Sequence, residues 1–262
     1  MTTRHLDILD DLARDLEVRS YGLQNARRLA KGYEDLVVVL IEPTDKAEEE
    51  PYQEMLAASK TLLCINETLQ FPSGGERDIE NTIILDVRAF RSNFIRTSQG
   101  LEDWIRDDDL VYGNLEKFMS CLRPRVVIFC QFVTDEANNK FVKGLCSSIK
   151  EAGDVYLQTL PNEHECLFIK IFHPMHCERS KDDALKRVMD EYLLEATFII
   201  ALNALAGYRI SGIGLKNLRN CAQDGPAVIF APEGVYVSYH WDGKFERAWF
   251  GAILVQTLVI GS

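Results

Sequence analysis

The feature that most constrains the fold is the run of residues 36–41, Leu-Val-Val-Val-Leu-Ile. Every position in this run is apolar, so the segment has no polar face and both of its faces must be buried. β-Branched residues also favour the extended backbone of a strand. The run therefore predicts the central strand of a parallel sheet that is covered on both sides.

Other apolar runs of strand length alternate with stretches of helical periodicity. We expect further strands at 61–65, 81–87, 125–130, 155–160 and 166–172. We expect helices at 3–16, 20–31, 51–58, 109–122, 135–152 and 181–206. Strands that alternate with helices predict an α/β fold, here a three-layer sandwich with a central mostly parallel sheet and helices on both faces. The acidic segment 46–50 is expected to be a solvated surface loop.

The character of the sequence changes after residue 206. Segments 227–231 and 235–239 are apolar and flank Pro-Glu-Gly, and Asp242-Gly243 begins another turn. Short strands separated by turn residues predict an antiparallel β meander. We therefore expect an α/β domain over 1–206, which includes the N-terminal helices, and a β-rich extension over 207–262 packed on the same domain.

Charge and cysteine content narrow the expected partners and compartment. The formal net charge is -11, which argues against a broad, unspecific nucleic-acid surface but leaves room for a local basic groove. The chain has seven cysteines. Because this number is odd and several of them lie in apolar runs, we expect free thiols in a reducing compartment. With no signal peptide and no apolar run long enough to span a bilayer, we expect an intracellular protein, nuclear or cytoplasmic and not secreted, without a membrane partner.

A polar loop follows the strand expected at 166–172. The strand should end at His173-Pro174, because proline has no N–H for a ladder and biases its predecessor towards an extended conformation. His173 is then expected just past the carboxyl end of a strand, where open α/β sheets bind their ligands. A histidine that only caps the strand is an equally good interpretation.

The order of the apolar strands and of their polar ends resembles the uracil-DNA glycosylase superfamily. In that family one strand ends in an Asn that reads the pyrimidine edge, and a later strand ends in a His-Pro loop. Here 81–90, Asn-Thr-Ile-Ile-Leu-Asp-Val-Arg-Ala-Phe, resembles the first part; 125–131 resembles the middle strand; and 172–176, Phe-His-Pro-Met-His, resembles the last. Upstream, Leu-Ile-Glu-Pro at 40–43 resembles the strand end where the family places a water-activating Asp or Asn.

The resemblance, which covers about 36–200, implies a site built from Glu42, Asn81 and His173. Glu42 would orient or deprotonate the attacking water. The amide of Asn81 would read the Watson–Crick edge of an extruded base. His173 would donate a hydrogen bond to the uracil O2 as negative charge builds there. The alternatives are a solvated loop carboxylate for Glu42 and a strand-start cap for Asn81.

Three further positions would complete this site, and the first two depart from the family pattern. Ile65 falls where the family usually has an aromatic residue that stacks on the base. Met175 follows the His-Pro pair where the family has smaller residues. Arg88 would contact a phosphate, although an ordinary surface arginine is the simpler interpretation.

A zinc site is the rival interpretation of the same region. The residues are ligand types that suit zinc and lie close in sequence: His164, Cys166, His173, His176 and Cys177. Their spacing fits no standard finger, and no Cys-x-x-Cys pair is present.

Two functional hypotheses follow. The first is a divergent glycosylase that excises uracil or a related base from DNA by hydrolysis of the N-glycosidic bond, without a cofactor. The second is a non-catalytic module of the same fold that binds a protein partner or nucleic acid. The negative charge disfavours tight DNA binding and favours the second. Convergence of Glu42, Asn81 and His173 on one pocket would favour the first.

Overall fold

The computed structural model of the chain describes residues 4–18, 20–41, 43, 46–90, 113–130, 155–160, 162–175, 184–205, 227–230 and 236–239. By its internal contacts the chain divides into two compact units, Met1–Gly207 and Tyr208–Ser262. Among the described residues no helix is both long and apolar enough to cross a membrane.

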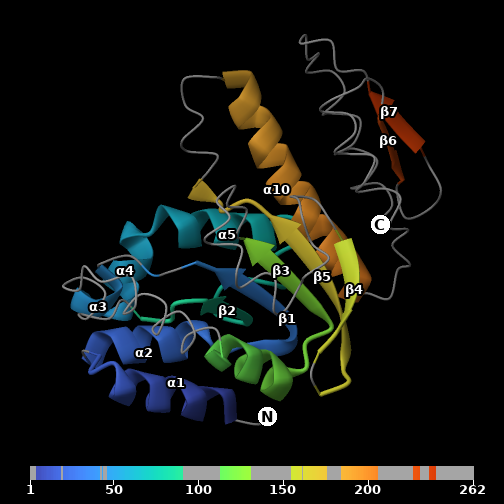
Figure 1. Cartoon of the computed structure of the whole chain (residues 1–262). Helices are drawn as coiled ribbons and strands as arrows, with labels where there is room; N and C mark the ends of the chain where they lie inside the picture. The colour runs from blue at the N-terminus through green and yellow to red at the C-terminus, as the bar shows by residue number, and fades with distance from the viewer. Residues whose placement is uncertain are drawn as a thin grey trace, which may run out of the picture. The chain divides into compact units, whose positions relative to one another are not determined.

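The first unit contains five described strands and seven described helices (Figure 1). The strands are β1 Tyr33–Leu40, β2 Thr82–Asp86, β3 Val126–Cys130, β4 Val155–Thr159 and β5 Glu165–Ile171. The helices are α1 Arg4–Asp15, α2 Ser20–Leu29, α3 Lys46–Glu49, α4 Tyr52–Ala58, α5 Lys60–Gln70, residues 113–122 and α10 Ala184–Leu205.

The strands form one sheet in the order β2-β1-β3-β5-β4. β1, β2, β3 and β5 are mutually parallel, and β4 joins the edge antiparallel to β5. The pairing aligns Leu85, Val39, Phe129 and Lys170 in one row across the four parallel strands. The predicted α/β fold with a parallel sheet is therefore confirmed, and most of the run at 36–41 forms the interior strand β1, which lies between β2 and β3.

Alternate residues of β1 belong to two separate hydrophobic cores, one on each face of the sheet. Val37 and Val39 face the core that contains α1 and helix 113–122. Leu36, Val38 and Leu40 face the core that contains α4, α5 and α10. All five side chains are 4% exposed or less, so helices cover both faces of β1 and explain why its sequence has no polar face.

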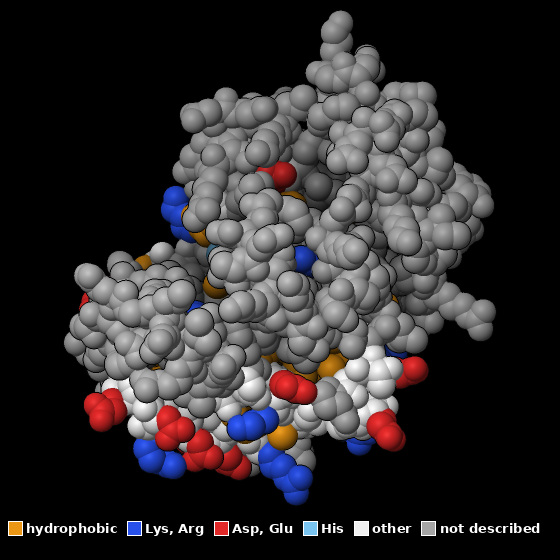
Figure 2. All heavy atoms as spheres, viewed as in Figure 1, with side chains coloured by type: hydrophobic (Ala, Val, Ile, Leu, Met, Phe, Trp, Pro, Cys, Tyr) orange, Lys and Arg blue, Asp and Glu red, His pale blue; other side chains and the backbone are white. Residues whose placement is uncertain are grey.

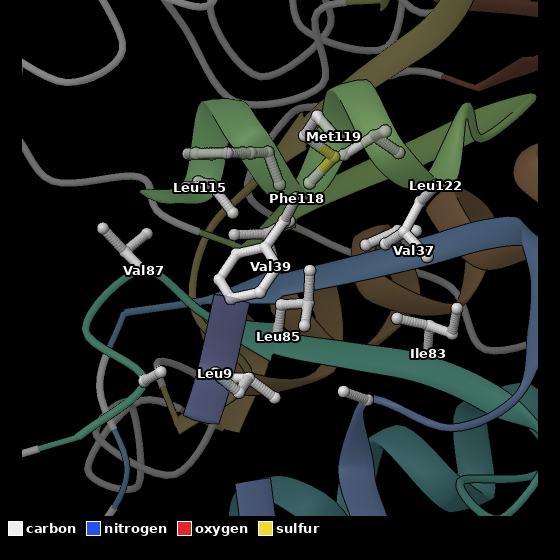
Figure 3. Close-up of a cluster of buried hydrophobic side chains, with 14 of the residues drawn as sticks. Leu9, Val37, Val39, Ile83, Leu85, Val87, Leu115, Phe118, Met119 and Leu122 are labelled. Carbon is white, nitrogen blue, oxygen red and sulfur yellow. The ribbon is translucent and has the colours of Figure 1, made fainter. Parts of the chain in front are cut away.

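Figure 3 shows how the first of these cores is packed. Phe118 of helix 113–122 points its ring toward Val39 of β1, and Leu9 of α1 lies beside Leu85 of β2. Leu9 is fully buried and Phe118 is 2% exposed. The outer surface of α1 and α2 instead carries charged side chains (Figure 2). Arg14 pairs with Asp11 on α1, and Arg27 of α2 pairs with Asp10 of α1. The amphipathic spacing predicted for the N-terminal helices thus has its physical basis in this core.

The strand expected at 61–65 is wrong: the segment lies inside α5. The hydroxyl of Ser59 caps this helix by accepting a hydrogen bond from the backbone N–H of Leu62 at 3.3 Å. Leu62, Ile65 and Leu69 are buried at helical spacing. A short apolar run does not distinguish a strand from a buried helix, and the periodicity extending to residue 69 decides for the helix.

The acidic segment after β1 is also more ordered than expected. Residues Lys46–Glu49 form the short helix α3, and Glu48 is 4% exposed. The side-chain amide of Asn25 on α2 donates hydrogen bonds to the carbonyl oxygens of Ala47 at 2.7 Å and Glu50 at 2.9 Å. This anchorage to α2 gives the charged segment a fixed structure.

In the second unit two short strands are described, β6 Ala227–Phe230 and β7 Tyr236–Tyr239, which pair antiparallel. They coincide with the first two strands expected in the tail. The turn at 242–243 and the segment after it lie outside the described residues, as do the helix expected at 135–152 and the first four residues of the helix expected at 109–122.

Candidate functional site

The carboxyl ends of the four parallel strands lie side by side at one end of the sheet, here called the carboxyl edge. The last strand residues are Leu40, Asp86, Cys130 and Ile171. From β1 the chain passes first to β2 on one side and later to β3 on the other. Open α/β sheets bind ligands at such a reversal of strand order, so the carboxyl edge beside β1 is the candidate site.

His173 lies at this edge, two residues beyond the end of β5, and its side chain is half-buried. Its Nδ1 accepts a hydrogen bond from the backbone N–H of Met175 at 3.3 Å. An Nδ1 that accepts carries no proton, so the neutral imidazole has its proton on Nε2. The ring is thereby oriented, with Nε2–H as a donor.

Arg88 belongs to the same edge. The backbone N–H groups of Val87 and Arg88 donate to the carbonyl oxygens of Leu40 and Ile41, each at 2.9 Å. These bonds extend the β1–β2 pairing past the ends of both strands and leave the Arg88 side chain half-buried. Glu42 follows Ile41 directly but lies outside the described residues.

Asn81 lies at the other end of the sheet. It immediately precedes β2, and its carbonyl oxygen accepts a hydrogen bond from the N–H of Tyr33 at the start of β1, at 2.9 Å. β2 has five residues, so its ends are roughly 17 Å apart at about 3.3 Å per residue. The structure therefore does not bring Asn81 together with His173, contrary to the site that the resemblance implies.

The Asn81 side chain is also engaged in its own loop. Its Oδ1 accepts a hydrogen bond from the N–H of Asp78 at 3.1 Å, and its Nδ2 donates to the carbonyl oxygen of Glu76 at 3.1 Å. Both bonds tie the turn before β2 to the start of that strand. They match the alternative interpretation of Asn81 as a strand-start cap.

Ile65 does not line an open pocket either. It is fully buried on α5, among the side chains that pack against the second face of the sheet. A side chain with no exposed surface offers no platform on which an extruded base could stack. The second predicted element of base recognition is therefore also missing from the carboxyl edge.

Of the five residues proposed as zinc ligands, the three that are described, His164, Cys166 and His173, do not gather at one place. His164 precedes β5 and His173 follows it, and a strand of seven residues separates its two ends by roughly 23 Å. His164 Nε2 hydrogen-bonds the carbonyl oxygen of Pro124 at 2.8 Å. His176 and Cys177 lie outside the described residues, and within those described no group of three His, Cys, Asp or Glu side chains could hold a metal ion.

Thiol chemistry is disfavoured both for Cys130, at the carboxyl end of β3, and for Cys166, near the start of β5. Burial, and secondarily the neighbouring Cys64, raise the pKa of the Cys130 thiol well above its ordinary value. Burial also raises the pKa of the Cys166 thiol to about 12. Both sulfurs are therefore protonated at neutral pH, and a protonated thiol is a poor nucleophile and a poor metal ligand.

Two polar residues near this edge were missed by the sequence reasoning. Asp86 is the last residue of β2, pairs with Leu40 and is half-buried. Lys170 is 1% exposed and, through its pairing with Phe129, belongs to the face covered by α1. The signals were present: Asp86 closes an apolar run, and Lys170 interrupts one. A residue that breaks a buried strand near its carboxyl end marks a position worth testing.

Comparison with known proteins adds no family to this description: no family model matches the chain, and no curated protein is significantly similar to it.

Proposed function

We propose that this chain is a non-catalytic module with a glycosylase-like α/β fold that binds a protein partner at the carboxyl edge of its sheet. The observation that carries the proposal is the position of Asn81 at the opposite edge from His173. The proposal includes a β meander in residues 207–262 as an extension of the module. It also includes an intracellular location, which the free thiols of Cys64, Cys121, Cys130 and Cys166 support.

Base excision requires its parts within hydrogen-bond reach of one base. A reader of the base edge and a donor to the base carbonyl cannot act together across roughly 17 Å of strand. Ile65, which would form the floor of the pocket, is fully buried in the core. These two placements favour a site that binds over a site that excises.

A protein is a better partner than nucleic acid for this edge. The formal net charge of -11 opposes association with a phosphate backbone. Arg88 and Met175, both half-buried here, are residue types enriched at protein interfaces. Asp86 and His173 add polar groups that can fix the orientation of a partner.

Site-specific photo-crosslinking tests the proposal. A benzophenone amino acid would replace Arg88 or Met175 at the carboxyl edge and, as a matched control, the exposed Glu76 at the opposite edge. Irradiation in cells, followed by mass spectrometry, is expected to give one defined protein adduct from positions 88 and 175 and none from 76. Equal adducts from both edges, or none from 88 and 175 in variants with wild-type thermal unfolding, would overturn it.

Base excision remains a second candidate because of the His173 tautomer. An imidazole with Nε2–H oriented by the Met175 bond is suited to donate a hydrogen bond to a developing oxyanion. In this candidate Asp86, rather than Asn81, ends the strand that reads the base. A carboxylate only accepts hydrogen bonds, so it would select a base edge that presents N–H donors.

A single-turnover excision assay separates the two candidates. Oligonucleotides that contain uracil or a thymine mismatch would be incubated with excess wild-type protein, with His173→Ala and with Asn81→Ala. The binding proposal predicts no abasic sites with any protein. Excision that His173→Ala reduces at least tenfold, while Asn81→Ala leaves it unchanged, would establish the second candidate and overturn the first.

A further inference from the structure

No further inference is drawn: the strongest candidate, the buried side chain of Lys170 on β5 near the carboxyl edge of the sheet, belongs to the site already described, and nothing in the described part of the chain shows which anionic group its ammonium serves.

Discussion

Arg77 and Asp35 form a two-point ion pair at the edge of the sheet where the parallel strands begin. Nη1 and Nη2 of the arginine donate to Oδ1 and Oδ2 of the aspartate at 3.0 and 2.5 Å. The guanidinium also lies over the ring of Tyr33, 4.8 Å from its centroid. Arg77 comes from the loop between α5 and β2, whereas Asp35 and Tyr33 belong to β1, so the pair holds that loop against β1.

This ion pair should contribute measurably to stability. Both side chains are at least two-thirds buried, so solvent screens the pair less than an exposed one, and Arg77→Ala is expected to cost about 1 kcal/mol. Arg77→Lys should recover only part of this, because an ammonium cannot make the two-point contact. Urea denaturation measures both effects. Arg14→Ala, whose pair with Asp11 is largely exposed, is the control and should change little; an equal loss in both variants would contradict the assignment.

Gly32 should not tolerate a side chain. A Cβ there would lie 2.7 Å from the carbonyl oxygen of Asn81 and 2.8 Å from backbone carbon atoms of Asn81 and Thr82. Because backbone atoms cannot move aside cheaply, Gly32→Ala should destabilise the protein by about 2 kcal/mol. Gly113→Ala is the matched control, since a Cβ at that position meets nothing within 4 Å. Thermal unfolding of the two variants measures the difference. Equal unfolding midpoints would show that the close approach at Gly32 is not maintained.

The stability of the protein should depend strongly on Phe118, which belongs to the core drawn in Figure 3. Its side chain is 2% exposed and packs between helix 113–122 and β1, so Phe118→Ala should cost about 3–5 kcal/mol through lost burial and the cavity left behind. Phe118→Leu should cost less and allow a folded comparison. Phe71→Ala removes the same group from a site that is 55% exposed and should stay within about 0.5 kcal/mol of wild type. Guanidinium denaturation of the three variants tests this order.

Cys166 should make folding sensitive to alkaline pH. Its pKa is raised by burial from 9.0 to about 12. Between these values the unfolded chain releases the thiol proton while the folded protein retains it. Stability is therefore expected to fall as pH rises from 9 towards 12. In Cys166→Ala the slope of stability against pH over this interval should be shallower, as measured by urea denaturation at each pH. An unchanged slope would show that the thiol is not held protonated.

Alkylation gives an independent check of the buried thiols. With iodoacetamide at pH 8.5, the half-buried Cys64 and Cys121 should react before the buried Cys130 and Cys166. Peptide mass mapping reports each site separately. In urea the four rates should become similar, which controls for intrinsic reactivity. Fast native labelling of Cys166 would contradict its burial.

Local sequence was sufficient for most elements of the α/β unit. The apolar run at 36–41 coincides with the buried end of β1, and the leucines of α1 recur at the spacing that its core face requires. Residues that interrupt an apolar run were also informative. Proline has no N–H for a ladder, so Pro174 predicted that the strand ends near His173, and β5 does end at Ile171. Each of these signals depends on only a few neighbouring residues, so it can be read without knowing the fold.

The run at 61–65 shows where local sequence fails. Its apolar residues fit a strand, but Ser59 caps a helix and Ile65 packs against the sheet as part of α5. The segment 46–50 fails for a related reason: Asn25, more than twenty residues away, supplies the hydrogen bonds that order it. For 61–65 the cap and the longer apolar periodicity lie just outside the run, whereas for 46–50 a contact distant in sequence selects the conformation.

By itself the sequence determined which segments are extended or helical and that β1 is buried on both faces. Only the tertiary structure decided which strand ends share an edge. Asn81 immediately precedes β2, and an antiparallel pairing of β1 with β2 would have placed it beside the carboxyl end of β1. The pairing is parallel, so Asn81 lies beside Tyr33 at the start of β1. The alternation of strands and helices predicted a mostly parallel sheet, but the order of the strands depends on the path of the connecting chain and on the packing of its helices, which no local pattern records.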